Sequence, residues 1–301
     1  MKRELSDKDL ELVSSIVKKR IFVPRSVRKV TVFLCGGALS DSENARSKMA
    51  NIFSKYPRYE ILYPEDLFDD LLAGQGQYSL LKLENILADS VDSIVLCPES
   101  PGSFAELGAF SNNEHLARKM IVVSNQKFKS DKSFVNYGPN RLVKASKTGK
   151  VININYGHLN DEDEQLKVYK RINDYITSIR KTYPVAKDVA NILETEHFVL
   201  PCMYLMDKIN NVSLYKLLKY ATGQDEQMCE IATRSAIGRL VQKSFITKAS
   251  MGYQVTRAGS EYVRRIFVST CLDMARSELL NAENRRNSAV SYDRVHRGAH
   301  L

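Results

Sequence analysis

Glu106 is the residue whose surroundings in this sequence most suggest chemistry. It follows an apolar run and a loop with two prolines and a glycine, in the stretch VDSIVLCPESPGSFAELGAF. One interpretation is structural, because Ser103 and Glu106 have the S-x-x-E spacing of a capping box. The serine would then accept from the amide of Glu106, and the glutamate would reach back to the amide of Ser103. Spacing alone favours this structural interpretation.

The loop before Glu106 favours a functional interpretation. Gly102 leaves room for a ligand to approach the backbone amides at the start of a helix, and Ser103 lies beside it. A carboxylate at this place could act as a nucleophile toward a ligand bound there.

Alternating strands and helices predict the fold that positions this acid. Short apolar runs indicate strands at residues 30–35, 59–63, 92–97, 119–124 and 150–156, and helical patterns follow from Asp41 and over 78–88, 103–117 and 161–181. We therefore predict an α/β fold with a Rossmann-like parallel sheet and helices on both faces. Ligands of such sheets bind beyond the carboxyl ends of the strands, where Glu106 is expected to lie.

A pair of glycines lies at the same end of the sheet. Gly36 and Gly37 directly follow the first strand, so their amides could hold a phosphate or a sugar hydroxyl, although such a pair is often only a tight turn. Asp92, at the start of the third strand, is expected to be structural.

The stretch SIVLCPESPGSFAELGAF resembles the nucleoside 2-deoxyribosyltransferase family, and VFLCGG is similar to that family's first strand and glycine loop. Phe110 departs from the small residue that ends the family motif. A phosphoribohydrolase group that resembles lysine decarboxylases fits less well, because this loop lacks its second glycine. The residues that match the deoxyribosyltransferase motif in order are Gly102, Ser103, Glu106, Leu107, Gly108 and Ala109.

This resemblance implies roles for individual residues. Glu106 matches the family nucleophile, a carboxylate that stabilises the positive charge on the sugar carbon as an N-glycosidic bond breaks and that can form a covalent glycosyl-enzyme, which water or a second base resolves. Glu84 is in phase with a second acid that positions the nucleophile or the sugar, although the family often has Asp there. The alternative for Glu84 is a solvated helix face. We expect Gly36, Gly37, Gly102 and Ser103 to bind substrate. Both families cut bonds between bases and sugars, so the expected reaction class is the same for either.

The C-terminal third resembles a winged helix-turn-helix. Three short helices, SLYKLLKYA, DEQMCEIA and TRSAIGRLVQKSFI, precede two short strands around Met251-Gly252 and a closing helix opened by Thr256-x-x-Gly259. We expect this module to contact nucleic acid, with a protein-contact role as the alternative. The predicted contact residues are Arg234, Arg239 and Lys243 on the third helix and Lys248 and Arg257 in the wing.

These features divide the chain into an N-terminal helix (1–29), a deoxyribosyltransferase-like domain (30–182), a linker helix with the winged helix (183–280) and a flexible basic tail (281–301). The net charge of +9 agrees with a polyanionic partner. Five scattered cysteines indicate no zinc site, and we expect neither a metal nor a bound cofactor. The sequence has no signal peptide and no membrane-spanning run, so we expect a cytoplasmic protein without membrane contact.

Together, the two modules resemble the effector proteins of antiviral retrons, whose reverse transcriptase makes a branched RNA–DNA hybrid that holds the effector in check. The resemblance implies a toxic effector that binds this complex and cleaves an N-glycosidic bond when released. NAD is the favoured substrate, and nucleosides or nucleotides come next. Both a monomer and a homo-oligomer are compatible with the sequence. The alternatives are a nucleotide-sensing transcriptional regulator without turnover and a salvage enzyme with an incidental appendage.

Overall fold

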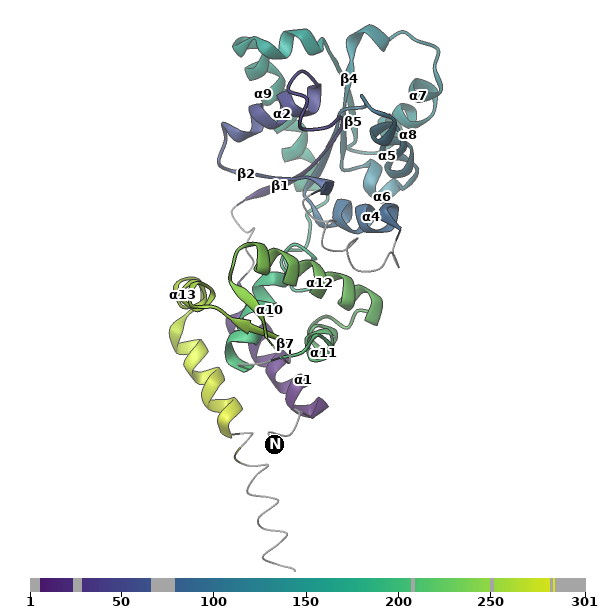
Figure 1. Cartoon of the computed structure of the whole chain (residues 1–301). Coiled ribbons are helices and arrows are strands. Elements are labelled where there is room, and N and C mark those ends of the chain that lie inside the picture. The colour runs from purple at the N-terminus through teal and green to yellow at the C-terminus, as the bar shows by residue number, and fades with distance from the viewer. Residues whose placement is uncertain are drawn as a thin grey trace, which may run out of the picture. The chain divides into compact units, whose positions relative to one another are not determined.

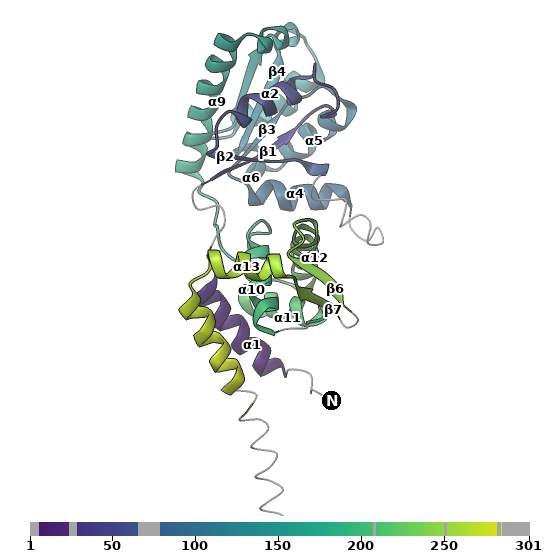
Figure 2. The same ribbon diagram turned by 60° about the vertical axis from the view of Figure 1, so that its left-hand side comes forward.

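The computed structural model describes residues 6–23, 29–65, 79–206, 209–249, 252–281 and 284. The chain divides into two compact units (Figures 1 and 2). The sheet unit is Ser26–Lys187, and the helical unit combines Met1–Arg25 with Asp188–Leu301. No helix in the described part of the chain is long and apolar enough to cross a membrane.

The sheet unit is built on five parallel strands in the order β2-β1-β3-β4-β5, as predicted. The three central strands are buried almost along their whole length, because helices cover both of their faces. This burial explains their continuous apolar runs. The strands are β1 (Val30–Cys35), β2 (Tyr59–Leu62), β3 (Ser93–Leu96), β4 (Met120–Asn125) and β5 (Lys150–Ile154).

Two layers of helices enclose this sheet (Figures 1 and 2). On one face, α2 (Ala45–Ser54) and α9 (Glu162–Thr182) bury Met49, Phe53 and Ile172 against the strands. On the other face, α5 packs on α4 and α8, and its Phe110 ring lies 6.2 Å from that of Phe33 on β1. The helices of this second layer are α4 (Leu80–Ser90), α5 (Pro101–Asn112), α6 (Glu114–Ala117), α7 (Phe134–Tyr137) and α8 (Pro139–Ala145). Short 3-10 turns, η2 (Gln126–Phe128) and η3 (Tyr156–Asn160), follow β4 and β5.

Two helices begin at other residues than the patterns predicted. α2 begins at Ala45 rather than near Asp41, because the Asn44 side chain accepts from the Ser47 amide at 2.7 Å. α5 begins at Pro101, and its capping box joins Ser100 to Ser103. The predicted capping box between Ser103 and Glu106 is therefore wrong, since Glu106 lies more than one turn inside the helix.

Asp92 has the structural role that its position suggested. It is buried at the start of β3, where Oδ2 accepts from the Thr31 amide at 2.9 Å and from Lys187 Nζ at 2.8 Å. Arg180 adds a bond to Oδ1 at 3.3 Å. These bonds tie the last residue of the sheet unit to the amino end of its sheet, away from the expected site.

The helical unit contains the N-terminal helix as an integral part. In α1 (Asp7–Ile16), Leu10, Val13 and Ile16 are buried, and Ser14 Oγ donates to the carbonyl of Leu217 at 2.9 Å. A π-helical turn, η1 (Val17–Ile21), continues α1. The other elements are α10 (Thr195–Met206), α11 (Asn211–Thr222), α12 (Glu226–Gln242), β6 (Ile246–Ala249), β7 (Gly252–Val255), α13 (Arg257–Ile266) and a helical stretch over 269–281.

The order of these elements is compatible with a winged helix. DEQMCEIA and TRSAIGRLVQ form the single helix α12 rather than two helices, so the three helices before the hairpin are α10, α11 and α12. β6 and β7 pair antiparallel, and an isolated antiparallel bridge joins Ile209 to Tyr253. Thr256 caps α13 by accepting from the Gly259 amide at 3.1 Å, as predicted. Of the expected tail, all residues after 281 except 284 lie outside the described residues.

Candidate active site

The site lies at the carboxyl ends of β1 and β3, the two neighbouring strands at which the strand order reverses. The chain passes from β1 outward to β2 and then returns to β3 on the other side of β1. Sheets of this kind bind ligands in the crevice at such a point. Cys35 ends β1 there, and the loop after β3 leads into α5, which carries Glu106.

Glu106 has the properties expected of a reactive carboxyl group. Its Oε2 is buried without a hydrogen-bond partner among the described residues. Burial, followed by the negative charge of Glu84, raises the pKa of Glu106 from 4.5 to about 7. The nearby Arg46 charge and a hydrogen bond with Cys35 act in the opposite direction. A buried oxygen that accepts no hydrogen bond lowers the stability of a folded protein, and such groups cluster at functional sites.

Glu84 lies close enough to Glu106 for its charge to raise the pKa of the Glu106 carboxyl group. It is buried on α4, with 7% of its surface exposed, so it is not part of a solvated helix face. Burial, followed by the charge of Glu65, raises its pKa to about 7. Two acids with pKa values near 7 hold about one proton between them at neutral pH. One carboxyl can then be ionised while its neighbour is neutral.

Arg46 completes this cluster, and the sequence analysis missed it. From the first turn of α2 its buried guanidinium donates to the carbonyls of Leu34, at 3.1 Å, and Gly37, at 3.0 Å. It also forms two parallel bonds of 2.7 Å to the carboxylate of Glu65. These bonds fix the loop after β1 and place a permanent positive charge near Glu106.

The sequence does contain a signal for Arg46. Arg46, Met49 and Phe53 follow the i, i+3, i+7 spacing of one helix face, and Met49 and Phe53 belong to the core. A charged residue at an apolar position of such a stripe is buried and must be paired. Its partner Glu65 lies beyond β2, so no local pattern connects the two.

Ser103 and Glu99 hold the loop that leads into α5. The hydroxyl of Ser103 accepts from the amides of Glu99, at 2.9 Å, and Ser100, at 2.8 Å. The carboxylate of Glu99 accepts from the amides of Ala45 and Arg46 at 2.7 and 3.1 Å. The first amides of α2 are therefore already paired, and Ser103, predicted to bind substrate, is 1% exposed and bonded within the loop.

The predicted substrate-binding glycines differ in the room around them. A side chain at Gly36 would meet the Cβ of Arg46 at 2.7 Å, and one at Gly37 would meet Nδ2 of Asn44 at 2.9 Å, so both are needed for close packing. At Gly102 the nearest atom would be Ser100 Oγ at 4.0 Å, and at Gly108 there is none within 4 Å. A side chain would therefore fit at Gly102 and at Gly108 without a clash.

Four of the five cations that were predicted to contact nucleic acid form ion pairs within the helical unit. Arg239 and Lys243 both bind Glu196, which is 2% exposed: Arg239 Nε at 3.3 Å, and Lys243 Nζ at 2.8 Å to each carboxylate oxygen. Arg239 also donates to the carbonyl of Ile192 at 2.8 Å. These two cations neutralise a buried carboxylate inside the unit.

The other three predicted cations are exposed at their charged ends. Arg234 pairs with Glu230 at 2.8 Å, and Arg257 with Glu261 at 2.9 Å. Lys248 lies exposed on β6. A contact of these residues with nucleic acid stays a prediction. In the described part of the chain, no three His, Cys, Asp or Glu side chains gather as a metal ion would require.

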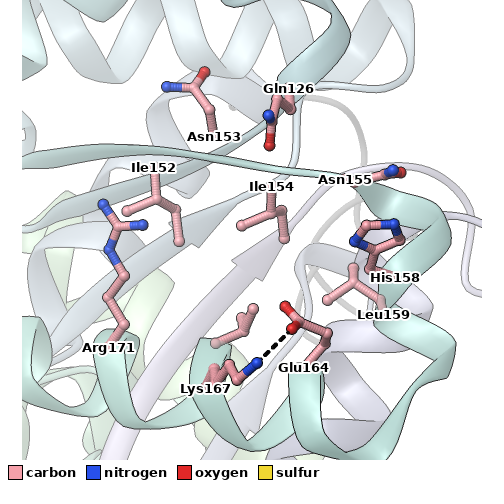
Figure 3. A pocket seen from close by; sticks show the side chains of 11 residues that line it. Gln126, Ile152, Asn153, Ile154, Asn155, His158, Leu159, Glu164, Lys167 and Arg171 are labelled. Atoms are coloured by element: carbon pink, nitrogen blue, oxygen red, sulfur yellow. Dashed lines mark hydrogen bonds and ion pairs between the residues drawn. The ribbon is translucent and has the colours of Figure 1, made fainter.

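A separate pocket of about 220 Å³ lies at the far edge of the sheet, between β5 and α9 (Figure 3). Ile152 and Ile154 of β5 point toward α9, and Lys167 is paired with Glu164 at 2.7 Å (Figure 3). None of the predicted site residues lines it. The pocket therefore does not belong to the acid cluster at β1 and β3.

The chain is similar to known retron proteins. The family model of the STM3845 retron effector protein matches residues 42–248. The chain is 44% identical over 301 residues, covering 98% of both chains, to the "Retron Ec86 putative ribosyltransferase/DNA-binding protein" of Escherichia coli. It is also 36% identical over 138 residues to the "Retron Ec73 putative ribosyltransferase/DNA-binding protein" of the same organism, covering 44% of this chain and 43% of that one.

Proposed function

The chain belongs to the STM3845 retron effector protein family, and we propose that it is a toxic effector that cleaves the N-glycosidic bond of a nucleotide-like substrate through Glu106. The observation that carries this proposal is the Glu106 carboxyl group, with one buried oxygen left unpaired among the described residues and with Glu84 beside it. The ribosyltransferase names of both relatives support the reaction class.

The proposed reaction has two steps. The ionised carboxylate of Glu106 attacks the anomeric carbon of the sugar, the bond from that carbon to the base nitrogen breaks, and the bonding electrons leave with the base. Water then attacks the same carbon, the bond from that carbon to the Glu106 oxygen breaks, and the proton lost by the water passes to Glu84 or to solvent. The products are the free sugar and the Glu106 carboxylate. Glu84 positions Glu106 or the sugar, while Arg46 holds the loop after β1 and favours the ionised nucleophile.

NAD is the favoured substrate on chemical grounds. The pyridinium nitrogen of its nicotinamide already carries a positive charge, so the base leaves as a neutral molecule without being protonated. A nucleoside needs a proton for most leaving bases, and Glu84 would have to supply it while Glu106 is ionised. Nucleosides and nucleotides are therefore the second choice.

We propose that a retron reverse transcriptase with its branched RNA–DNA hybrid holds the effector in check. The family assignment and the DNA-binding names of the relatives support this partner. The helical unit is compatible with a winged helix, and we propose that it contributes to the contact through the exposed cations Lys248 and Arg257. Release from the complex would then free the catalytic activity.

The test is to incubate the purified protein with NAD, with nucleosides and with nucleotides, and to follow the free base by chromatography. The proposal expects release of nicotinamide from NAD at a higher kcat/KM than release of bases from the other compounds. A protein that binds a nucleotide without releasing any base would instead be the nucleotide-sensing regulator, and the proposed activity would be excluded.

A further inference from the structure

The crossover from β4 to β5 is strongly basic. Residues 126–147 contain six Lys and Arg residues against one acid, Asp131. All six cations are exposed, and none forms an ion pair within the described part of the chain. These six are Lys127, Lys129, Lys132, Arg141, Lys144 and Lys147.

Exposed aromatic rings lie among these cations. Phe134 is 84% exposed, Tyr137 is 60% exposed and Phe128 is 51% exposed, and Leu142 adds a further apolar side chain. Phe134 and Tyr137 are three residues apart on α7, so they lie on the same side of that helical turn. Exposing such rings to water gains nothing for the fold, and apolar groups gathered on a surface mark a binding site.

The segment has an ordered backbone that can present these side chains together. Asn136 Nδ2 donates to the carbonyls of Phe128 and Asp131, each at 2.9 Å, which ties the turn after β4 to α7. Asn140 of α8 donates to the side chain of Asn136 at 3.0 Å. The helices α7 and α8 pack on each other, and α8 packs on α5 (Figure 1). We call residues 126–147 the crossover surface.

We infer that the crossover surface binds single-stranded DNA. Cations held along a segment with exposed rings are the composition by which proteins hold single strands, because phosphates pair with the cations and bases stack on the rings. A duplex keeps its base faces stacked on each other, so Phe134 and Tyr137 would gain little from it. The choice of DNA over RNA rests on the proposed function, in which the DNA-binding names of both relatives support contact with the DNA of the branched hybrid.

The crossover surface is better equipped for this contact than the predicted positions of the helical unit. Of those five cations, Arg239 and Lys243 neutralise a buried glutamate, and two more are paired with neighbouring acids. At the crossover surface all six can pair with phosphates without giving up a carboxylate. The inference therefore places a DNA contact on the unit that also carries the acid cluster.

The experiment measures the anisotropy of fluorescein-labelled dT20 with the full-length protein at several salt concentrations. We expect Phe134→Ala with Tyr137→Ala to weaken binding by about tenfold or more while leaving the salt dependence unchanged, because stacking is not ionic. Lys144→Gln with Lys147→Gln should weaken binding and reduce the log–log salt slope by about 1.4, since each phosphate contact to a single strand contributes about 0.7.

The matched control is Leu166→Ala with Lys170→Gln, which removes an exposed apolar side chain and an exposed cation from α9 and should leave dT20 binding unchanged. Circular dichroism melts confirm that each variant is folded. Equal binding by wild type and both crossover variants would overturn the inference. Binding of duplex DNA or of U20 as tightly as dT20 would also overturn it. Displacement of dT20 by poly-glutamate at equal charge would overturn it as well, because it would indicate charge attraction alone. Base release is not part of the measurement, so its outcome is independent of the proposed activity.

Discussion

At the scale of single residues, Glu106 and Glu84 decide how the site behaves with pH. The folded protein holds both carboxyl groups at a pKa of about 7, against an ordinary value of 4.5. Between these pH values the folded state binds more protons than the unfolded chain does. Stability is therefore lost as the pH rises from about 4.5 to about 7, and this cost stays constant above that range.

Glu106→Gln should consequently stabilise the protein at pH 8 and have little effect at pH 4.5. The amide cannot ionise, so it removes a penalty that, after allowance for partial exposure and for coupling to Glu84, we put at about 1–3 kcal/mol. Urea unfolding of both proteins at the two pH values measures the difference. The same effect at both pH values would show that the carboxyl charge carries no cost in the folded state.

Glu84→Gln should move the pH dependence of turnover. Removing the neighbouring negative charge lowers the pKa of Glu106, so the acid limb of kcat/KM should shift to lower pH while the rate at the optimum falls. Glu114→Gln, at an exposed position on α6, is the control and should leave the profile unchanged. If the acid limb of kcat/KM and the rate at the optimum were both those of the wild type, Glu84 would have no role in the site.

At the scale of elements, the loop between β3 and α5 decides whether Glu106 is held in place. Ser103→Ala removes an acceptor for two backbone amides, so we expect a loss of about 1–2 kcal/mol in the free energy of unfolding, and a fall in kcat. A direct bond between Ser103 and substrate would give another result, namely a higher KM at unchanged stability. Denaturant melts with steady-state kinetics distinguish the two.

The elements also show where sequence reasoning succeeds and where it stops. β1, β3 and β4 are buried on both faces, so their continuous apolar runs located them, and the alternation with helices gave the parallel sheet. The helix starts were wrong because capping depends on side-chain bonds, such as that of Asn44, which several nearby residues could have made. The resemblance gave the expectation that Glu84 acts with Glu106. The ion pair of Arg46 with Glu65 joins separate elements, so only the structure reveals it.

At the scale of the whole molecule, some lysines and arginines pair with buried acids and stabilise the fold, whereas others are exposed and can bind a partner. A count of these residues in the sequence does not distinguish the two groups. Arg239 was predicted to bind nucleic acid, yet it neutralises the buried Glu196. The exposed cations and rings of 126–147 were not recognised in the sequence, because their exposure depends on how α7 and α8 pack.

Arg239→Gln should therefore act on stability. Removing one partner of a buried ion pair typically costs about 3–5 kcal/mol, so the melting temperature of the helical unit should fall. Arg257→Gln is the control, because its side chain is 94% exposed and should change stability by less than about 0.5 kcal/mol. Calorimetry on both variants provides the comparison. An unchanged melting temperature in Arg239→Gln would show that Lys243 alone satisfies Glu196.

The central claim is that Glu106 performs the cleavage of an N-glycosidic bond. The most direct measurement compares the release of nicotinamide from NAD by wild type, by Glu106→Gln and by the control Glu114→Gln, all shown to be folded. We predict release by wild type and by the control, and a loss of about a thousandfold or more in Glu106→Gln, as is found when an enzyme loses its nucleophile. Release by Glu106→Gln at the wild-type rate would contradict the account.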